Sequence, residues 1–371
     1  MRKILHMFGL AAIGLVTTLH GQSADDEGLS LKKVQVSGLV DGYVSKSFQN
    51  PASGTIAARA FDTDTNTFML NMAKVEIQHA VEPIGFRLDL GFGRGFEIFN
   101  GLEPGGAALQ YIPQAYVSVS PKSWNGFQID FGKFYTSAGA EPTESNLNWN
   151  YSRSRIYAFG PYFHMGIRMS KPINDHVTAG FQLVNGWDSV RDANNGKTIG
   201  LTSAVEYDKF SWYNTYYGGP ENAGTSRGWR NFYDTVVKVG TDKAQAYVNF
   251  DYGRMRPVDD AGSLFTQEIV ALAVAGRFHA GGNFYVSPRY GWYDDRDGWA
   301  FGDKNTLQDF TLTGEYRHPK GFVGMVEYRR DWADQAFFAR GNDLPGSPSS
   351  KNADSLTVGV MIVLNAQTLG N

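Results

Sequence analysis

Residues 84–93 read IGFRLDLGFG, in which apolar side chains alternate with polar side chains or glycine. Successive side chains of a strand point to opposite sides, so this stretch predicts a strand with one apolar and one polar face. The same alternation recurs along the chain after Val34, while helical periodicity is hard to find. Further examples are residues 126–133, 161–170, 244–253, 309–318 and 354–365.

The links between these segments alternate between short and long. The short links fall at residues 81–83, 120–125, 171–175, 208–209, 240–243, 279–282 and 318–321. The long polar links fall near residues 47–66, 94–107, 136–160, 186–197, 218–229, 254–266, 294–306 and 333–354. An up-and-down barrel with tight turns at one end and long loops at the other predicts this rhythm, whereas a Greek-key sandwich does not. We therefore expect an all-β, transmembrane, antiparallel barrel of about sixteen strands, with fourteen or eighteen as alternatives.

The two faces of the predicted strands suit a membrane barrel. Unpaired backbone groups cost several kcal/mol in hydrocarbon, so the sheet must close on itself. The apolar faces would meet lipid, and the arginines on these strands sit on the opposite, inward parity: Arg87, Arg168, Arg289, Arg317 and Arg329. Aromatic residues near strand ends fit interfacial girdles: Tyr207, Phe210, Trp212, Trp292, Phe322 and Trp332.

The composition excludes several classes of protein. The chain has 371 residues, 34 basic and 37 acidic side chains and a net charge of −3, so it has no basic footprint for nucleic acid. It contains no cysteine, which removes disulfides, thiolate metal sites and a cysteine nucleophile. Aromatic residues make up 14% of the chain and charged residues only 19%, with 43 glycines. A typical soluble enzyme is richer in charge and poorer in glycine and aromatic residues.

The first residues predict export. Arg2 and Lys3 precede an apolar run from Ile4 to Leu19, which is typical of a secretory signal peptide. We expect residues 1–24 to be cleaved and residues 25–371 to form a single barrel domain. A retained membrane anchor is the alternative, but the apolar run is short for a span.

Several motifs together resemble the OmpL-like beta-barrel porins of bacterial outer membranes. The matching stretches run in order across nearly all of the mature chain: VSGLVDGYVSKSF, IGFRLDLGFG, PQAYVSVS, FQIDFGKFYTSAGAE, NWNYSRSRIYAFGPYFHMGIR, LVNGWDSVRDANNGKTIG, NTYYGGPE, DTVVKV, NFDYGR and VEYRRDW. The resemblance implies an outer-membrane barrel that conducts small solutes, without identifying the solute. One departure is the C-terminus, which reads NAQTLGN where such barrels usually end in an aromatic residue.

The longest link, residues 136–160, follows the fifth predicted strand, from which general porins fold a constriction loop into the lumen. It carries the candidate constriction residues Glu141, Glu144, Arg153 and Arg155. Acidic groups on this loop facing inward arginines would set a transverse field across the pore. The candidate wall residues are Arg87, Asp89, Asp130, Arg168, Asp251, Arg289, Glu315, Arg317, Glu327 and Arg329. The alternative for each is a cross-strand salt bridge that touches no solute.

The leading functional hypothesis is a porin for passive diffusion of small hydrophilic solutes or ions. A structural or adhesive barrel with an occluded lumen is the second hypothesis. A barrel enzyme is the third, and no Ser–His pair in a recognisable frame supports it. We expect no catalytic residues and no cofactor. We also expect no metal ligands, because Asp62, Asp64 and Asn66 are not followed by the glycine and glutamate that a calcium loop needs.

The expected partners follow from the barrel. They are outer-membrane lipids with lipopolysaccharide, small hydrophilic solutes, and no nucleic acid. The lipid-side faces of the first and last strands are small and aliphatic, so they would contact either a second copy, as in a homotrimer, or plain lipid. Their members are Val34, Val36, Gly38, Val40, Val44, Val358, Val360 and Ile362.

Overall fold

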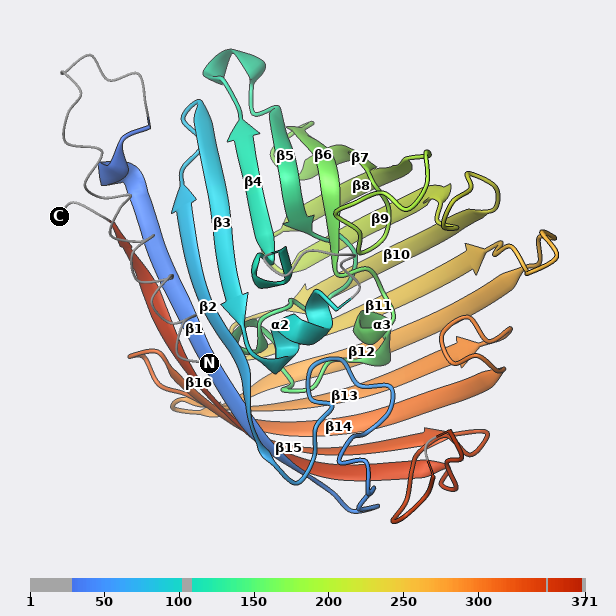
Figure 1. Ribbon diagram of the computed structural model, residues 1–371. Helices are drawn as coiled ribbons and strands as arrows, with labels where there is room; N and C mark the ends of the chain where they lie inside the picture. The colour runs from blue at the N-terminus through green and yellow to red at the C-terminus, as the bar shows by residue number, and fades with distance from the viewer. Residues whose placement is uncertain (1–28, 102–108, 345, 369–371) are drawn as a thin grey trace, which may run out of the picture.

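The computed structural model describes residues 29–101, 109–344 and 346–368. They form a closed antiparallel barrel of sixteen strands, as the sequence predicts. Each strand pairs with its neighbour in sequence, and β1 (Val34–Ser47) pairs with β16 (Asn352–Thr368) to close the barrel (Figure 1). The predicted signal peptide, residues 1–24, lies outside the described residues.

The remaining strands follow the order of the chain. They are β2 (Phe68–His79), β3 (Ile84–Phe92), β4 (Gln114–Val119), β5 (Gln128–Tyr135), β6 (Phe163–Pro172), β7 (Val177–Val184), β8 (Thr198–Tyr207), β9 (Phe210–Pro220), β10 (Trp229–Gly240), β11 (Ala244–Met255), β12 (Gln267–Gly281), β13 (Phe284–Asp295), β14 (Asn305–Arg317) and β15 (Phe322–Ala333). The helices are short: α2 (Arg94–Phe99), α3 (Arg155–Ala158), and the 3-10 turns η1 (Leu31–Lys33), η2 (Leu109–Tyr111), η3 (Lys122–Trp124) and η4 (Ser145–Leu147).

The register of β3 shows how the alternation becomes two faces. Asp89 lies opposite Glu76 on β2 and opposite Gln114 on β4, so polar side chains of three neighbouring strands share the inner face. The outer face is apolar, and Phe131 on β5, for example, is exposed on it. Large hydrophobic side chains are exposed on the outer face all around the barrel.

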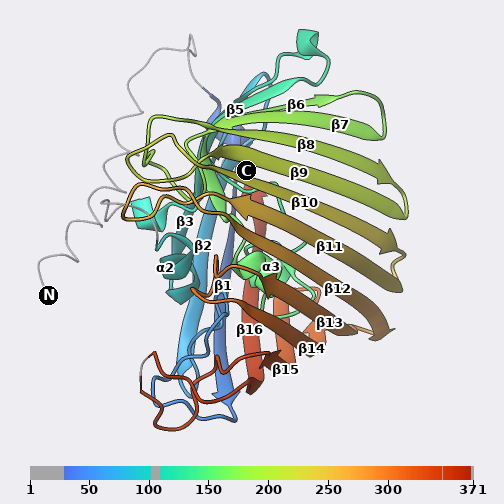
Figure 2. The same cartoon turned by 90° about the vertical axis from the view of Figure 1, so that its right-hand side faces the viewer.

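The long links gather at one end of the barrel and the short turns at the other. At the long-loop end, the loop 48–67 and the loop 334–351 lie side by side, where Ala52 donates its N–H to the carbonyl of Gly341 (Figures 1 and 2). Both α2 and α3 lie within long links, where the sequence showed no helical periodicity because each is no more than six residues long. None of the described helices is long and apolar enough to cross a membrane.

Candidate functional site in the barrel lumen

The loop 136–162, which connects β5 to β6, lies inside the barrel and contacts the opposite wall. Ala140 donates its N–H to Asn249 on β11 at 2.9 Å, and the hydroxyl of Tyr151 donates to Asp41 on β1 at 2.9 Å. In both views α3 is seen within the ring of strands (Figures 1 and 2). The segment therefore crosses the lumen between distant parts of the wall.

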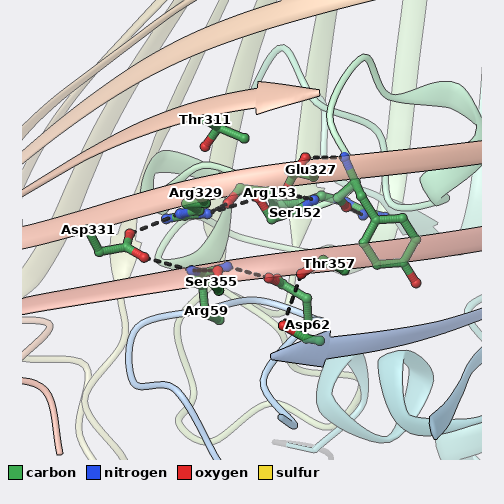
Figure 3. A network of polar contacts seen from close by, with 12 residues as sticks. Arg59, Asp62, Ser152, Arg153, Thr311, Glu327, Arg329, Asp331, Ser355 and Thr357 are labelled. Carbon is green, nitrogen blue, oxygen red and sulfur yellow. Dashed lines mark hydrogen bonds and ion pairs between the residues drawn. The ribbon is translucent and has the colours of Figure 1, made fainter. Parts of the chain in front are cut away.

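The charged centre of the loop is Arg155, on α3. Its guanidinium contacts Asp309 on β14 at 2.8 Å and Asp331 on β15 at 2.6 Å. Asp331 also binds Arg329 of its own strand at 2.9 Å and Arg59 of the loop 48–67 at 2.7 Å. Figure 3 shows Asp331 between Arg329 and Arg59. All of these groups are buried, so removing one partner would leave an uncompensated charge, a loss of about 3–5 kcal/mol.

Glu141 holds the start of the loop. One of its oxygens accepts from Arg289 on β13 at 2.7 Å, and the other accepts from the N–H of Ser154 at 2.9 Å. Arg289 in turn donates to the carbonyl of Ser152 at 2.5 Å. The wall therefore donates charge-assisted hydrogen bonds to the loop at two points, and such bonds are stronger than neutral ones.

Glu144 and Arg153 also form their polar contacts within the protein. Glu144 lies 2.5 Å from the ammonium group of Lys74 on β2, and it accepts from the hydroxyl of Tyr135 at 3.0 Å. Arg153 donates to the carbonyl of Tyr151 at 2.6 Å and to that of Thr143. The four candidate constriction residues are therefore all buried against loop or wall.

An apolar contact completes the attachment of the loop. The inner face of β12 carries only small side chains along its central part, Ala271, Ala273 and Ala275, and these pack in one cluster with Ala140 and Ile156 of the loop. Small residues leave room for a second layer of chain inside the barrel. Gly359 on β16 also leaves room for the loop, because a Cβ at this position would lie 2.3 Å from the ring of Tyr151.

The predicted wall residues separate into two groups by exposure. Seven are buried: Asp89, Asp130, Asp251, Arg289, Glu315, Glu327 and Arg329. The other three keep part of the side chain accessible, namely Arg87 (24%), Arg168 (28%) and Arg317 (35%). Each of these arginines is paired to a buried carboxylate, Asp89, Asp130 and Glu315 respectively. The accessible part of each pair therefore belongs to the arginine.

Several residues of this network were not among the predicted ones. Asp309 and Asp331 follow the inward parity of β14 and β15, so the period-two pattern contained their signal. Asp41 and Lys74 also lie on inner faces, opposite Met361 and Leu39 respectively. Arg59 comes from a loop without periodicity, and no sequence pattern indicates its place in the cluster.

The described residues contain no group of three or more histidine, aspartate or glutamate side chains placed to hold a metal ion. Cavities remain on either side of the loop. One of about 330 Å³ is lined by Lys74, Arg87 and Glu144 among others. Another of about 360 Å³ lies among Phe159, Trp187 and Arg230, next to the long-loop end.

A closed sixteen-stranded barrel with a polar inner face and a long inward loop defines the class of outer-membrane porins. A profile of the family described as "Putative beta-barrel porin-2, OmpL-like" matches residues 33–364, and the chain belongs to this family. The resemblance stated from the sequence motifs is thereby confirmed. No protein with curated annotation matches the chain.

Solved structures show the same fold at low sequence identity. The anion-selective porin from Comamonas acidovorans superposes with a TM-score of 0.62 at 14% identity, covering 89% of this chain and 99% of that one. The outer membrane channel DcaP of Acinetobacter baumannii gives 0.58 at 13% identity, with 89% and 97% covered. OmpT of Vibrio cholerae in its trimer form gives 0.55 at 13% identity, with 89% and 98% covered. At such identities the likeness concerns the fold alone.

Proposed function

We propose that this protein is a porin of the bacterial outer membrane, through which small hydrophilic solutes or ions diffuse passively. The observation that carries the proposal is a closed barrel whose inner face is polar and crossed by one long loop. Sixteen strands are wide enough to leave an aqueous passage beside such a loop. In this proposal the segment 136–160 narrows the passage, and the guanidiniums of Arg87, Arg168 and Arg317 line it.

The loop network supports a constriction role because it fixes the loop while the wall residues Arg87, Arg168 and Arg317 stay partly accessible. Arg155 binds carboxylates on β14 and β15. Glu141 binds an arginine on β13, and Glu144 binds a lysine on β2. A loop attached at separate points around the lumen keeps a constant cross-section. A fixed cross-section is what size selection by a passive pore requires.

Planar-bilayer recordings test the proposal. The wild-type protein should give stepwise, ohmic openings. In the double variant Glu141→Gln, Glu144→Gln, Arg289 and Lys74 each lose one carboxylate partner and the lumen loses two negative charges, so the reversal potential across a salt gradient should shift toward anion preference. The control Asp242→Asn, in an exposed short turn, should leave the reversal potential unchanged. An unchanged reversal potential in the double variant would contradict the constriction role of these residues.

The burial of the loop charges also favours a second function, that of a structural or adhesive barrel with an occluded lumen. The charged groups of the loop are buried in contacts with the wall and with one another, so they do not line an open passage. Complete absence of conductance from folded protein in the same recordings would support this alternative and overturn the porin. A barrel enzyme has less support, because no described histidine ring is hydrogen-bonded to a serine hydroxyl.

The surroundings of the barrel follow from the same proposal. Its apolar outer face would contact outer-membrane lipids and, at the long-loop end, lipopolysaccharide. The aliphatic outer face of β1 and β16 includes Val40, Val358 and Val360, all exposed. We propose that this seam packs against further copies of the chain in a homotrimer.

A further inference from the structure

Arg230, at the start of β10, packs against two neighbouring indole rings at the long-loop end of the barrel. Its guanidinium carbon is 4.6 Å from the ring centroid of Trp187, in the loop 185–197, and 5.4 Å from that of Trp299, in the loop 296–304. Both rings are held in place, since Trp187 packs edge-on against Phe232 and a Cβ on Gly253 would meet the ring of Trp299. The aromatic rings therefore hold the guanidinium as a cation.

The edge of this guanidinium has no strong acceptor. In the described part of the chain, no carboxylate oxygen lies within 4.0 Å of Arg230, whereas Arg155, Arg289 and Arg329 each form an ion pair. Its Nε atom is buried without a hydrogen-bond partner, and an Nη2 atom reaches only the sulfur of Met255, at 3.9 Å. Burying one such N–H donor without an acceptor costs about 1–3 kcal/mol.

Two acidic residues lie near Arg230, but other partners use their oxygens. Glu221 accepts from the hydroxyl of Thr198 at 2.7 Å and from the N–H of Trp187 at 3.1 Å. One oxygen of Asp188 accepts from the backbone N–H groups of Tyr162 and Phe163. Both carboxyl groups therefore hold the loops around the site, and neither contacts the guanidinium.

The donors of Arg230 border an empty space. Arg230 lines the cavity of about 360 Å³ together with the aromatic side chains of Phe159, Trp187 and Trp299 and the amides of Asn185 and Asn194. Asp188 and Glu221, whose hydrogen bonds to the surrounding loops are given above, also line it. A smaller adjoining space reaches His164, whose Nε2 atom also lacks a partner. A cavity with aromatic walls, a few polar groups and one arginine that forms no ion pair has the chemistry of a small-molecule site.

We propose that this cavity binds a small organic carboxylate with a flat apolar body. The carboxylate would accept from the free edge of the Arg230 guanidinium, which matches its planar, two-oxygen geometry. The body of the ligand would pack against Phe159 and the indoles, and the volume accommodates a single aromatic ring. The site lies at the long-loop end, so it would select solutes before they reach the loop 136–162. Binding at equilibrium does not depend on conduction, so this proposal stands or falls separately from the porin.

Calorimetric titration of the full-length protein in detergent micelles tests the site, with benzoate as the probe. Quenching of tryptophan fluorescence provides a second readout because two indoles border the guanidinium. Wild-type protein should bind benzoate, and Arg230→Gln should weaken this binding by about tenfold or more, the loss expected for one charge-assisted contact. Arg230→Lys, which keeps the charge but loses the planar fork, should bind with intermediate affinity. The control Arg256→Gln, at an exposed loop position, should bind as the wild type does.

Two further ligands separate the carboxylate from other occupants. Benzamide has the same shape without the charge and should bind at least about tenfold more weakly than benzoate. Inorganic phosphate lacks the apolar body and should also bind more weakly. Equal affinity for benzamide or for phosphate would overturn the carboxylate assignment. Benzoate binding that is absent from the wild type, or unchanged in a folded Arg230→Gln variant, would overturn the site itself.

Discussion

At the scale of single residues, Asp188 couples the loop 185–197 to pH. Its side chain is buried in the loop, and one oxygen accepts from Tyr162 N–H at 2.6 Å and from Phe163 N–H at 3.0 Å. Burial raises the pKa of Asp188 from its ordinary value of 3.8 to about 7, although the two hydrogen bonds act in the opposite direction. The folded protein therefore binds a proton here that the unfolded chain has already lost at neutral pH.

The sign of the pH effect follows from this difference. Protonated Asp188 stabilises the folded protein relative to the unfolded chain. This contribution to the free energy of unfolding, roughly 4 kcal/mol at most, is complete below about pH 4 and is lost as the pH rises through 7. We expect the temperature at which the folded electrophoretic band disappears to fall between pH 5 and pH 8. Asp188→Asn should remove this dependence, whereas Asp192→Asn in the same loop should keep it. A pH dependence that persists in Asp188→Asn would assign the effect to another group.

At the scale of elements, β12 and the loop 136–162 form one packed unit. The stretch 267–276, QEIVALAVAG, is apolar on both faces, which an ordinary barrel strand is not. Its outer face is exposed at Val274, and its inner face of three alanines packs in one cluster with Ala140 and Ile156 of the loop. Sequence reasoning identified the loop but not the strand on which it packs. An apolar inner face indicates a strand that is covered on both sides, so the signal was present in β12.

A larger side chain on the inner face of β12 should displace the loop. Ala273→Leu would force extra methyl groups into a close-packed contact, at a cost of about 1–3 kcal/mol. We expect a lower unfolding temperature and a single-channel conductance that differs from that of the wild type. Val274→Leu, the next residue on the same strand, faces outward and should change neither quantity. Equal behaviour of the two variants would show that the loop does not rest on the alanine stripe.

At the scale of the whole molecule, the barrel has two kinds of outer surface. Large aromatic residues such as Tyr207, Phe210 and Trp212 are exposed on one part of it, whereas the seam of β1 and β16 carries Val40, Val358 and Val360. Small aliphatic side chains give a smooth surface on which a second barrel can pack closely. The seam also joins the two ends of the chain, so the same residues would serve closure and assembly.

Native electrophoresis of detergent-solubilised protein should show a trimer. Val360→Trp places a bulky ring on the seam and should convert the trimer to monomers. Val274→Trp places the same ring on the outer face of β12, away from the seam, and should leave the trimer intact. Both valines are exposed outward, which makes the two variants comparable. A wild-type protein that migrates only as a monomer would remove the trimer proposal.

The sequence by itself predicted the barrel, a strand number of about sixteen with fourteen or eighteen as alternatives, and the link 136–160 as the one that enters the lumen. Side-chain alternation along a strand is local, and the lengths of links are read directly from the chain, so neither needs tertiary information. It also determined that Arg289 and Arg329 face inward.

Only the tertiary structure decided what those inward groups contact. Arg59 and Asp331 are 272 positions apart, and Arg155 and Asp331 are 176 positions apart. Parity assigns a side chain to a face, but the partner on that face depends on how far around the barrel a loop reaches. The same reason explains why Arg230, inward by parity like the others, is left facing a cavity while they face carboxylates.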